Sequence, residues 1–280
     1  ITGGCHVLNG CKEYMNGCCN CQEVKRNFGI TKRIYNKKTS LLTNDRVVLT
    51  APSHWTLQNV KKSKVTKNIQ CYVIGNTLDF DIFDIMSDEM LRNKLGNIQM
   101  NQKIRILFGA LNSIETPYKG YDYLIQLLKI MEDNDSAATK KYEINIFGTK
   151  NEEYGKLFGY ECHYWGHIID ERKLAAIYNI CDVYMVPSLE DSFNQTVLES
   201  CACGTPVVSF RTGGIVDILE HKVTGYLAEY KNPSDLYMGL LWILDNNFNN
   251  KIGSAARRRV LKYYNPDNIV EKYIELYESV

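Results

Sequence analysis

Three carboxylates stand close together in the segment SLEDSFNQTVLESCACGTPVV, residues 188–208. Glu190 and Asp191 follow directly after the apolar run DVYMVP, and Glu199 comes eight residues after Asp191. Carboxylates accept hydrogen bonds from paired hydroxyls, and the free N–H groups at a helix start favour phosphate. The alternative is a solvated loop acid and a surface helix acid, and the spacing by itself favours this plainer interpretation.

The helix that follows the two acids is expected to begin near Asn194 or Gln195. Its unpaired N–H groups and the positive end of its dipole would face a bound phosphate. A carboxylate beside a diphosphate would be repelled, so Asp191 and Glu199 should face hydroxyl-rich parts of the ligand. A phosphate site flanked by two diol acceptors matches a nucleotide sugar, and we take this as a hypothesis for the segment.

The composition of the 280-residue chain, 45% hydrophobic and 23% charged, is typical of a globular protein. Its formal net charge of +1 argues against a dedicated nucleic-acid binder. No apolar run approaches the roughly 20 residues that a membrane span needs. The chain starts at Ile1 without Met, so we expect it to be a portion of a longer protein.

Short apolar runs alternate with helical patterns from Lys103 onward. Continuous apolar strands separated by helices predict a doubly wound α/β domain with a parallel sheet. The expected strands are IRILFG (104–109), EINIFG (143–148), DVYMVP (182–187) and TPVVSF (205–210). The expected helices lie within 119–133, 170–181, 194–203, 233–245 and 266–279, the last two closing the chain.

The segment VPSLEDSFNQTVLESCACGTPVVSFRTGGIVDIL (186–219) resembles the donor-binding signature of retaining glycosyltransferases with the GT-B fold. These belong to the large bacterial polysaccharide and lipopolysaccharide family, the glycosyltransferase family 4 type. That family carries an acid, seven residues and then Glu, and here the pair is Asp191 and Glu199, with Asp where Glu is usual. The similarity extends to GHIIDERKLAAIYNICDVYMVPS before the segment, to HKVTGYLAEYKNPSDLYMGLLWIL after it, and to APSHW and IGNTLDFDIF upstream.

The resemblance implies a GT-B-like fold and a division of the chain into three parts. Residues 1–80 would be the end of an acceptor-side α/β domain with a cysteine-rich start. Residues 81–265 would form a Rossmann-like domain that binds the nucleotide-sugar donor. Residues 266–280 would form a C-terminal helix that packs back on the first domain.

The resemblance also implies roles for individual residues. Glu199 would accept the ribose hydroxyls, and Asp191 would hold hydroxyls of the donor sugar. Lys119, in TPYKGYDYL, would neutralise the diphosphate as charge builds on the leaving group. Backbone N–H groups around Phe193, Asn194 and Gln195 would meet the diphosphate and the sugar.

The remaining donor contacts implied by the resemblance are spread over several loops. Gly109 would let the backbone approach the ligand. The usual Arg before the Lys is missing from FGALNSIETPYKG, where Asn112 could donate a hydrogen bond without carrying a charge. The base would lie near three residues, Gly166, His167 and Ile168. Glu190 and Thr196 complete the expected donor-binding set.

These roles imply a hexosyltransferase that moves sugar from a nucleoside-diphosphate sugar to a saccharide or lipid-linked acceptor in surface polysaccharide synthesis. No cofactor is expected for catalysis. The expected location is the cytoplasm, with a position at the inner face of the membrane and peripheral membrane association left open. The alternative is a donor-binding fragment or nucleotide-binding interaction module without turnover, because most of the acceptor-side domain is expected to be missing.

Ten cysteines are unevenly placed, with five in the first 21 residues, and the pattern does not resemble a secreted disulfide scaffold. Cys5, Cys11, Cys18 and Cys21 could place four thiolates around a structural zinc ion. The alternative is a reduced glycine-rich loop whose cysteines simply pack.

Three charged motifs are given structural interpretations. We expect Asp79-Phe80-Asp81 to be part of a linker rather than a metal site. KKSKVTK (61–67) could contact anionic lipid, although a solvated helix end is the favoured interpretation. ARRRV, residues 256–260, is expected to be an exposed helix face.

Overall fold

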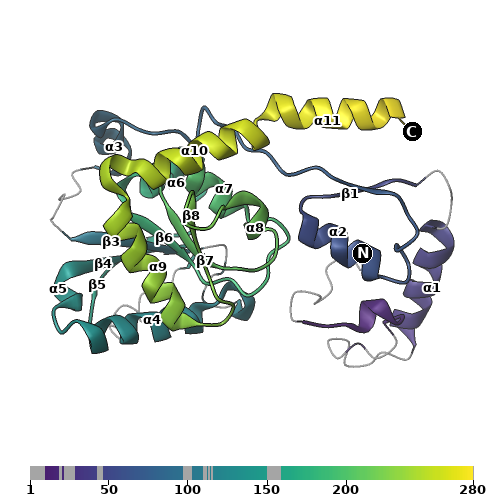
Figure 1. Cartoon of the computed structure of the whole chain (residues 1–280), viewed down its shortest axis with the longest axis horizontal. Helices are drawn as coiled ribbons and strands as arrows, with labels where there is room; N and C mark the ends of the chain where they lie inside the picture. The colour runs from purple at the N-terminus through teal and green to yellow at the C-terminus, as the bar shows by residue number, and fades with distance from the viewer. Residues whose placement is uncertain are drawn as a thin grey trace.

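The computed structural model describes residues 10–18, 21, 29–42, 47–96, 103–109, 112, 114, 116–149 and 159–279. Two α/β units are visible, a small N-terminal one with a two-stranded sheet and a larger one with a six-stranded sheet (Figure 1). Among the described helices, none combines the length and the apolar character needed to cross a bilayer.

All six strands of the larger sheet are parallel, in the order β5-β4-β3-β6-β7-β8. They are β3 (Ile104–Gly109), β4 (Tyr142–Phe147), β5 (Glu161–Gly166), β6 (Val183–Val186), β7 (Val207–Phe210) and β8 (Gly225–Ala228). The chain runs outward from β3 to β5 and returns to β6 on the other side of β3, so the strand order reverses between β3 and β6. This confirms the predicted doubly wound α/β fold, and ligands of such sheets bind beyond the strand ends at the reversal.

Strands β3, β4, β6 and β7 confirm the four predicted strands, while β5 and β8 were missed. In β6, β7 and β8 every residue is buried, as expected for strands covered on both faces. β5 lies at the sheet edge, where exposed Glu161 and His163 interrupt its apolar residues. Its sequence therefore lacks the continuous apolar run that identified the central strands.

Helices cover both faces of the large sheet and create two hydrophobic cores (Figure 1). On one face lie α4 (Tyr121–Asn134) and α9 (Pro233–Asn246), packed against each other. On the other lie α6 (Glu171–Ile180), α7 (Gln195–Ala202) and α10 (Lys251–Tyr264), with α3 (Asp88–Leu95) packed against α6. Shorter helical segments are α5 (Ala138–Lys141), α8 (Ile215–Ile218), η2 (Glu13–Met15), η3 (Pro117–Lys119) and η5 (Phe248–Asn250).

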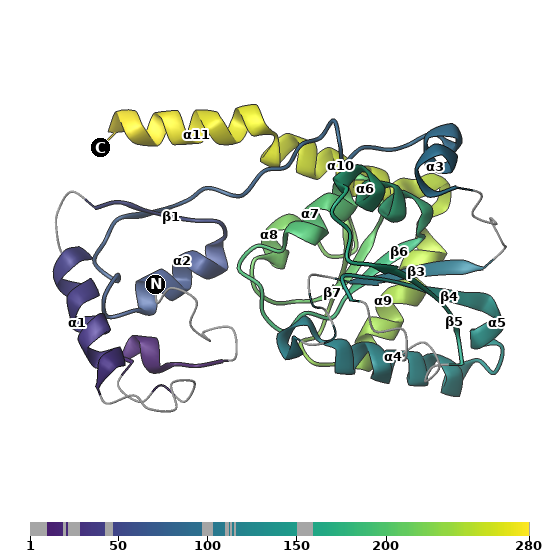
Figure 2. The same ribbon diagram turned by 180° about the vertical axis from the view of Figure 1, so that it is seen from behind.

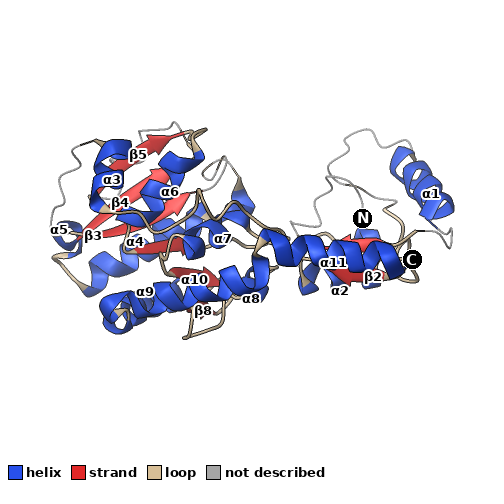
Figure 3. Cartoon of the chain, turned by 90° about the horizontal axis from the view of Figure 1, so that it is seen from above, coloured by secondary structure: helices blue, strands red, loops and turns tan. Residues whose placement is uncertain are grey.

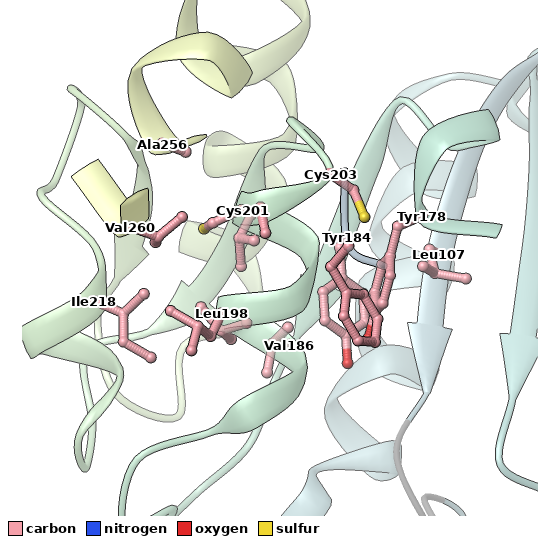
Figure 4. Close-up of a cluster of buried hydrophobic side chains, with 14 of the residues drawn as sticks. Leu107, Tyr178, Tyr184, Val186, Leu198, Cys201, Cys203, Ile218, Ala256 and Val260 are labelled. Carbon is pink, nitrogen blue, oxygen red and sulfur yellow. The ribbon is translucent and has the colours of Figure 1, made fainter. Parts of the chain in front are cut away.

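The core on the side of α6, α7 and α10 brings together side chains from the sheet and from these three helices and α8. Tyr178 of α6 and Tyr184 of β6 lie next to each other with ring centroids 5.5 Å apart, close to Leu107 of β3 (Figure 4). Cys201 and Cys203 are buried in this core, as expected of apolar-packed thiols. A close-packed core of this kind holds the residues that extend from it in fixed positions.

The ARRRV motif lies in α10, a helix that the sequence analysis expected only as an exposed face at residues 256–260. Ala256 and Val260 are buried in the core. Arg257 pairs with Asp84 at 2.6 Å, and Arg259 Nε donates to the Ile218 carbonyl at 2.8 Å. The expected exposed helix face is therefore wrong, because two of the three arginines connect α10 to the segment before α3 and to α8.

The smaller unit contains β1 (Leu49–Ala51) and β2 (Cys71–Val73), which pair in parallel, with α1 (Ile30–Leu42) and α2 (His54–Lys62). The last helix, α11 (Pro266–Ser279), extends from the larger unit across to the smaller one (Figures 2 and 3). There Ile269 and Leu276 are buried together with Ile74, which follows β2. The chain thus crosses between the units twice, and Thr77 Oγ1 donates to the Tyr264 carbonyl at 2.6 Å where the two crossings meet.

Candidate functional site

The candidate site lies at the carboxyl ends of β3 and β6, where the strand order reverses. The loop after β6 carries Glu190 and Asp191 into the start of α7, and the loop after β3 leads through η3 to Lys119. Because both strands run in the same direction, their following loops meet at one edge of the sheet. The fold therefore brings together residues from segments more than 70 positions apart.

Lys119 and Asp191 form an ion pair at this edge, with Lys119 Nζ 2.9 Å from Asp191 Oδ2. The side chains are only 20% and 15% exposed, so water screens this pair less than a surface pair. The other carboxylate oxygen, Oδ1, accepts the Asn194 N–H at 2.9 Å and the Phe193 N–H at 3.3 Å. Asp191 thus occupies the positively polarised region that a ligand anion would use.

The start of α7 is shaped by Asn194, its N-cap residue, which adopts a left-handed conformation with φ of 70°. Its Oδ1 accepts the Val197 N–H at 3.1 Å, as N-cap side chains do. No acceptor for the N–H groups of Gln195 and Thr196 is found in the described part of the chain. Of the three N–H groups expected to meet the ligand, those of Phe193 and Asn194 thus donate to Asp191 in this structure, and their contact with a ligand stays a prediction.

The side chains of the same segment serve the scaffold. Phe193 is buried and packs edge-to-face on Tyr264. Gln195 Nε2 donates to the Thr77 carbonyl at 3.0 Å, which ties α7 to the connection between the units. Thr196 Oγ1 lies 2.9 Å from the Tyr184 hydroxyl, whose oxygen is 2.5 Å from the Gly109 carbonyl. The helix start is consequently anchored to β3 and β6.

Glu199 lies one turn further along α7, and the Tyr178 hydroxyl donates to its Oε2 at 3.0 Å. Burial among protein atoms raises the pKa of Glu199 to about 7, although the Tyr178 hydrogen bond opposes this shift. Tyr178 itself is completely buried. Tyr178 was not among the predicted site residues; its only signal in the sequence was a polar aromatic residue on the apolar face of the helix KLAAIYNI.

Glu190, expected among the donor contacts, faces the smaller unit. Burial raises the pKa of its carboxyl group, whereas a hydrogen bond from the Gly10 N–H and the charge of Lys231 lower it. One carboxylate oxygen, Oε2, is buried without a hydrogen-bond partner in the described part of the chain. Glu190 and Asp191 are adjacent in sequence, yet Glu190 contacts the smaller unit and Asp191 contacts Lys119.

Two glycines set the close approach of the strands and loops around the pair. A Cβ on Gly109 would lie 2.6 Å from the Phe147 carbonyl oxygen, so this glycine serves the packing of β3 on β4. Its expected role of letting the backbone approach the ligand stays a prediction. Gly120 has φ of 77°, and a Cβ there would lie 1.7 Å from the Pro187 carbonyl oxygen. Gly120 thereby allows the Lys119 loop to rest directly on the end of β6.

The remaining predicted donor residues lie along the same sheet edge but apart from the ion pair. Asn112 is exposed with φ of 51°, and its N–H donates to the Gly148 carbonyl at 3.1 Å. Gly166 ends β5, followed by the exposed His167 and the partly buried Ile168. The Gly148 N–H donates to the Gly166 carbonyl at 2.8 Å, which links these loops beyond β4 and β5.

The start of α2 in the smaller unit contacts the loop that carries Asp191. Ser53 Oγ donates to the Ser192 carbonyl at 2.5 Å, and Thr56 Oγ1 lies 3.3 Å from the same oxygen. The His54 N–H donates to Asp217 Oδ2 at 2.7 Å. The motif APSHW, noted in the sequence only as similar to the end of a first domain, therefore forms the interface beside the candidate site.

The predicted metal residues are only partly described. Cys5 lies outside the described residues, while Cys11, Cys18 and Cys21 are described and partly buried. No group of three or more potential ligands is arranged for a metal among the residues that the structure describes. In the Asp79-Phe80-Asp81 motif, Asp79 Oδ1 accepts the Asp81 N–H at 2.9 Å and closes a turn.

A sequence model described as "Glycosyl transferases group 1" matches residues 92–259, which is more than half of the chain. The chain belongs to this glycosyl transferases group 1 family. The match contains the ion pair, α7 and Glu199, so the candidate site lies in the part that defines the family.

Relatives of this group 1 chain were found among both curated proteins and solved structures. An uncharacterized glycosyltransferase of Methanocaldococcus jannaschii is 28% identical over 213 residues, covering 72% of this chain and 52% of the relative. Sucrose-phosphate synthase of Thermosynechococcus elongatus aligns with a TM-score of 0.73 and 19% identity, over 95% of this chain and 65% of that chain. HepE of Anabaena, in complex with UDP-glucose, aligns with a TM-score of 0.68 and 18% identity, over 90% and 68% of the two chains.

These similarities show that the group 1 chain has the GT-B glycosyltransferase fold predicted from its sequence. The chain spans between half and two thirds of the length of the first curated relatives that it matches.

Proposed function

We propose that this chain binds a nucleoside-diphosphate sugar and contributes to its transfer, with retention, to a saccharide or lipid-linked acceptor. The observation that carries the proposal is the Lys119–Asp191 ion pair at the start of α7. The pair lies with the N–H groups at the start of α7 at the strand-order reversal, where doubly wound sheets bind ligands, and this supports Asp191 as a diol acceptor. HepE, a structural neighbour, is in complex with UDP-glucose.

Each residue would have a separate part in donor binding. A diphosphate oxygen would replace Asp191 Oδ2 as the partner of Lys119, and the N–H groups of Gln195 and Thr196 would supply further donors. The freed Asp191 oxygen would then accept a hydroxyl of the sugar. Glu199, once deprotonated, would accept the ribose hydroxyls. The base would lie towards Gly166, His167 and Ile168.

The chemistry required of these groups is stabilisation of the leaving nucleoside diphosphate. The bond between the anomeric carbon and the diphosphate oxygen breaks, and its electron pair stays on the diphosphate. The acceptor hydroxyl oxygen forms the new bond on the face that the diphosphate leaves, and its proton passes to the leaving diphosphate oxygen. Lys119 and the N–H groups lie where this added negative charge develops, so they lower the barrier by preorganised electrostatics. We therefore expect no cofactor for the transfer step, and any zinc at Cys5, Cys11, Cys18 and Cys21 to be structural.

We further propose that the chain is part of a hexosyltransferase of surface polysaccharide synthesis, which works in the cytoplasm at the inner face of the membrane. It is supported by the resemblance of the Asp191–Glu199 segment and by a cysteine pattern typical of a reducing compartment. A second candidate is a donor-binding module without turnover. It is favoured because this chain matches only 52% of the length of the Methanocaldococcus jannaschii relative. Transfer also requires an acceptor held against the anomeric carbon.

A thermal-shift panel of nucleoside diphosphates and their sugars tests the proposal. A ligand at 100 times its Kd should stabilise the chain by about 2.7 kcal/mol, which appears as a raised Tm. Nucleoside monophosphates and free sugars serve as controls. No shift with any diphosphate would contradict the proposal. A shift without transfer to any acceptor would favour the second candidate.

A further inference from the structure

The edge strand β5 carries one extra residue where it meets the loop beyond the sheet. Ile146 of β4 pairs with Tyr164 of β5. The next pair is formed by Phe147 and Gly166, so Trp165 is an extra residue that makes a β-bulge. A bulge redirects the side chains around it, and bulges are frequent next to active sites. Trp165 therefore stands at the entry to the loop that starts at Gly166, towards which the donor base would lie.

Trp165 is held by a row of polar side chains that joins three strands. Its Nε1 donates to Asn145 Oδ1 at 2.9 Å, and Asn145 Nδ2 donates to Glu143 Oε1 at 3.0 Å. Arg105 Nε of β3 lies 3.5 Å from the same Glu143 oxygen, and these two charged side chains are only 4% and 10% exposed. Burying charged groups contributes little net stability, but a buried hydrogen-bond network fixes the side chains that it joins. The row therefore gives the Trp165 indole a set position.

The loop after Trp165 is anchored at both ends and open in the middle. Trp165 and Ile168 both pack against the core on the side of α6. Gly166 adopts a left-handed conformation with φ of 68°, and His167 beside it is exposed. Asp170 then caps the start of α6 with its side chain. The backbone groups between these anchors are thus held in set directions, and such preorganisation favours recognition of a flat base by hydrogen bonds.

The candidate donor site extends towards this loop. Glu199 accepts a hydrogen bond from Tyr178 of α6, the helix that begins directly after the loop. Burial is the main cause of the raised pKa of Glu199, and the charge of Glu171, the first residue of α6, adds to it. The start of α6 therefore lies close to Glu199. With its ribose at Glu199, a nucleoside would direct its base towards the loop between β5 and α6.

We propose that Trp165 and Asn145 are positioning residues that set the shape of the loop at residues 166–168 and thereby decide which base of a nucleoside diphosphate it accepts. This role rests on the proposed function, because it requires that the chain binds a nucleoside diphosphate. Neither side chain needs to touch the ligand. The bulge and the indole hydrogen bond fix the direction in which β5 enters the loop, whereas Lys119 and Asp191 act on the diphosphate and the sugar. Base preference and diphosphate affinity should therefore be separable.

Calorimetry with uridine, guanosine and adenosine diphosphates and with inorganic pyrophosphate tests this role. Trp165→Phe keeps an aromatic ring but removes the N–H donor. We expect it to weaken binding of the preferred nucleoside diphosphate by about 3- to 10-fold and to narrow the differences among the three bases. Affinity for pyrophosphate should stay within about twofold, because the diphosphate contacts are unchanged. Trp242→Phe is the matched control on α9, which packs on β7 and β8, and it should leave every affinity within about twofold.

Asn145→Leu removes the same hydrogen bond from its other end. Its effect on base preference should match that of Trp165→Phe, and the two substitutions together should cost less affinity than the sum of their separate effects. Circular dichroism and thermal unfolding establish that each variant is folded. Should Trp165→Phe fail to fold, Asn145→Leu is compared with the original chain in its place.

Three results would overturn the role of Trp165 and Asn145 while leaving the proposed function intact. One is an unchanged base preference in the variants, and another is equal affinity of the original chain for all three bases. The third is a loss of pyrophosphate affinity as large as the loss for nucleoside diphosphates, which would indicate that the two residues only support the fold. If the original chain binds no nucleoside diphosphate, the proposed function fails and this role fails with it.

Discussion

Lys119 Nζ lies 2.9 Å from Asp191 Oδ2, although the two residues are 72 positions apart in the sequence. The ion pair joins the loop after β3 to the loop after β6 at the reversal of strand order. Asp191 Oδ1 accepts backbone N–H groups at the same time, so its carboxylate occupies the place of a ligand anion. Donor binding should therefore exchange the partner of Lys119.

The first prediction concerns this exchange. Lys119→Met should weaken nucleoside-diphosphate binding by about 10- to 100-fold, because a charged hydrogen bond contributes roughly 1.5–3 kcal/mol. Isothermal calorimetry measures the loss, and Lys129→Met on the exposed face of α4 is the matched control.

Asp191→Asn keeps an acceptor for the Phe193 and Asn194 N–H groups but removes the competing charge. We expect it to bind the free diphosphate as well as the original protein or better, and to lose discrimination between donor sugars. Equal weakening of diphosphate binding by both substitutions would contradict the exchange.

Nucleotide binding should depend on pH through Glu199. Burial raises the pKa of Glu199 to about 7, and only the deprotonated carboxylate accepts two ribose hydroxyls. Affinity should therefore rise as the pH increases through about 7. Tyr178→Phe removes the hydrogen bond that lowers this pKa, so the midpoint should move to higher pH.

Calorimetric titrations between about pH 5.5 and 8.5 measure this midpoint. Tyr160→Phe is the matched control, since the Tyr160 hydroxyl donates to the remote Leu128 carbonyl at 3.0 Å. Glu199→Gln should remove the pH dependence that belongs to this site. An unchanged midpoint in Tyr178→Phe would show that Tyr178 does not set the protonation of Glu199.

Glu199 should also lower stability at neutral and basic pH. Its folded-state pKa of about 7 lies above its ordinary value of 4.5, so the unfolded chain releases the proton first. The free energy of unfolding should therefore fall as the pH rises from about 4.5 to about 7.

The substitution Glu199→Gln should then raise the free energy of unfolding at pH 8 by about 1–2 kcal/mol while weakening nucleotide binding. Urea denaturation at pH 5 and pH 8 measures this, with the exposed Glu278→Gln as control. A Gln variant that is less stable than the original protein at pH 8 would refute the expectation.

Gly120 should be more sensitive to substitution than another left-handed glycine. Gly120→Ala adds a Cβ that would lie 1.7 Å from the Pro187 carbonyl oxygen, so the Lys119 loop must move. We expect a loss of more than about 2 kcal/mol in stability, together with weaker diphosphate binding. Gly29→Ala is the control, since Gly29 has φ of 75° and no atom near the added Cβ; it should cost less stability than Gly120→Ala. Similar losses of stability at both positions would show that the positive φ, and not the contact with Pro187, causes the loss.

Zinc, if Cys5, Cys11, Cys18 and Cys21 bind it, should be stoichiometric and confined to the first 21 residues. Elemental analysis of the chain and of a version starting at Asn27 measures this. Cys18→Ser with Cys21→Ser should remove the metal, and Cys71→Ser should not. Equal metal in both versions, or none in either, would exclude the proposed ligand set.

The local signals in the sequence were sufficient for the central sheet and for the start of α7. Apolar runs identified β3, β4, β6 and β7, because strands buried on both faces need continuous hydrophobic residues. Asn194 was predicted near the helix start, and its side chain is the N-cap. The edge strand β5 was not predicted because its exposed residues, Glu161 and His163, alternate with partly buried ones.

Which functional groups meet was decided by the tertiary structure. The sequence by itself determined that Asp191 follows a strand and that Glu199 lies on the next helix, because both are properties of neighbouring residues. Only the folded chain pairs Lys119 with Asp191 and buries the Tyr178 hydroxyl against Glu199. These contacts depend on strand order, helix packing and the exclusion of water, which involve residues far apart along the chain. For the same reason, the charge of Arg257 and Arg259 predicted exposure, whereas packing of α10 placed both against neighbouring loops.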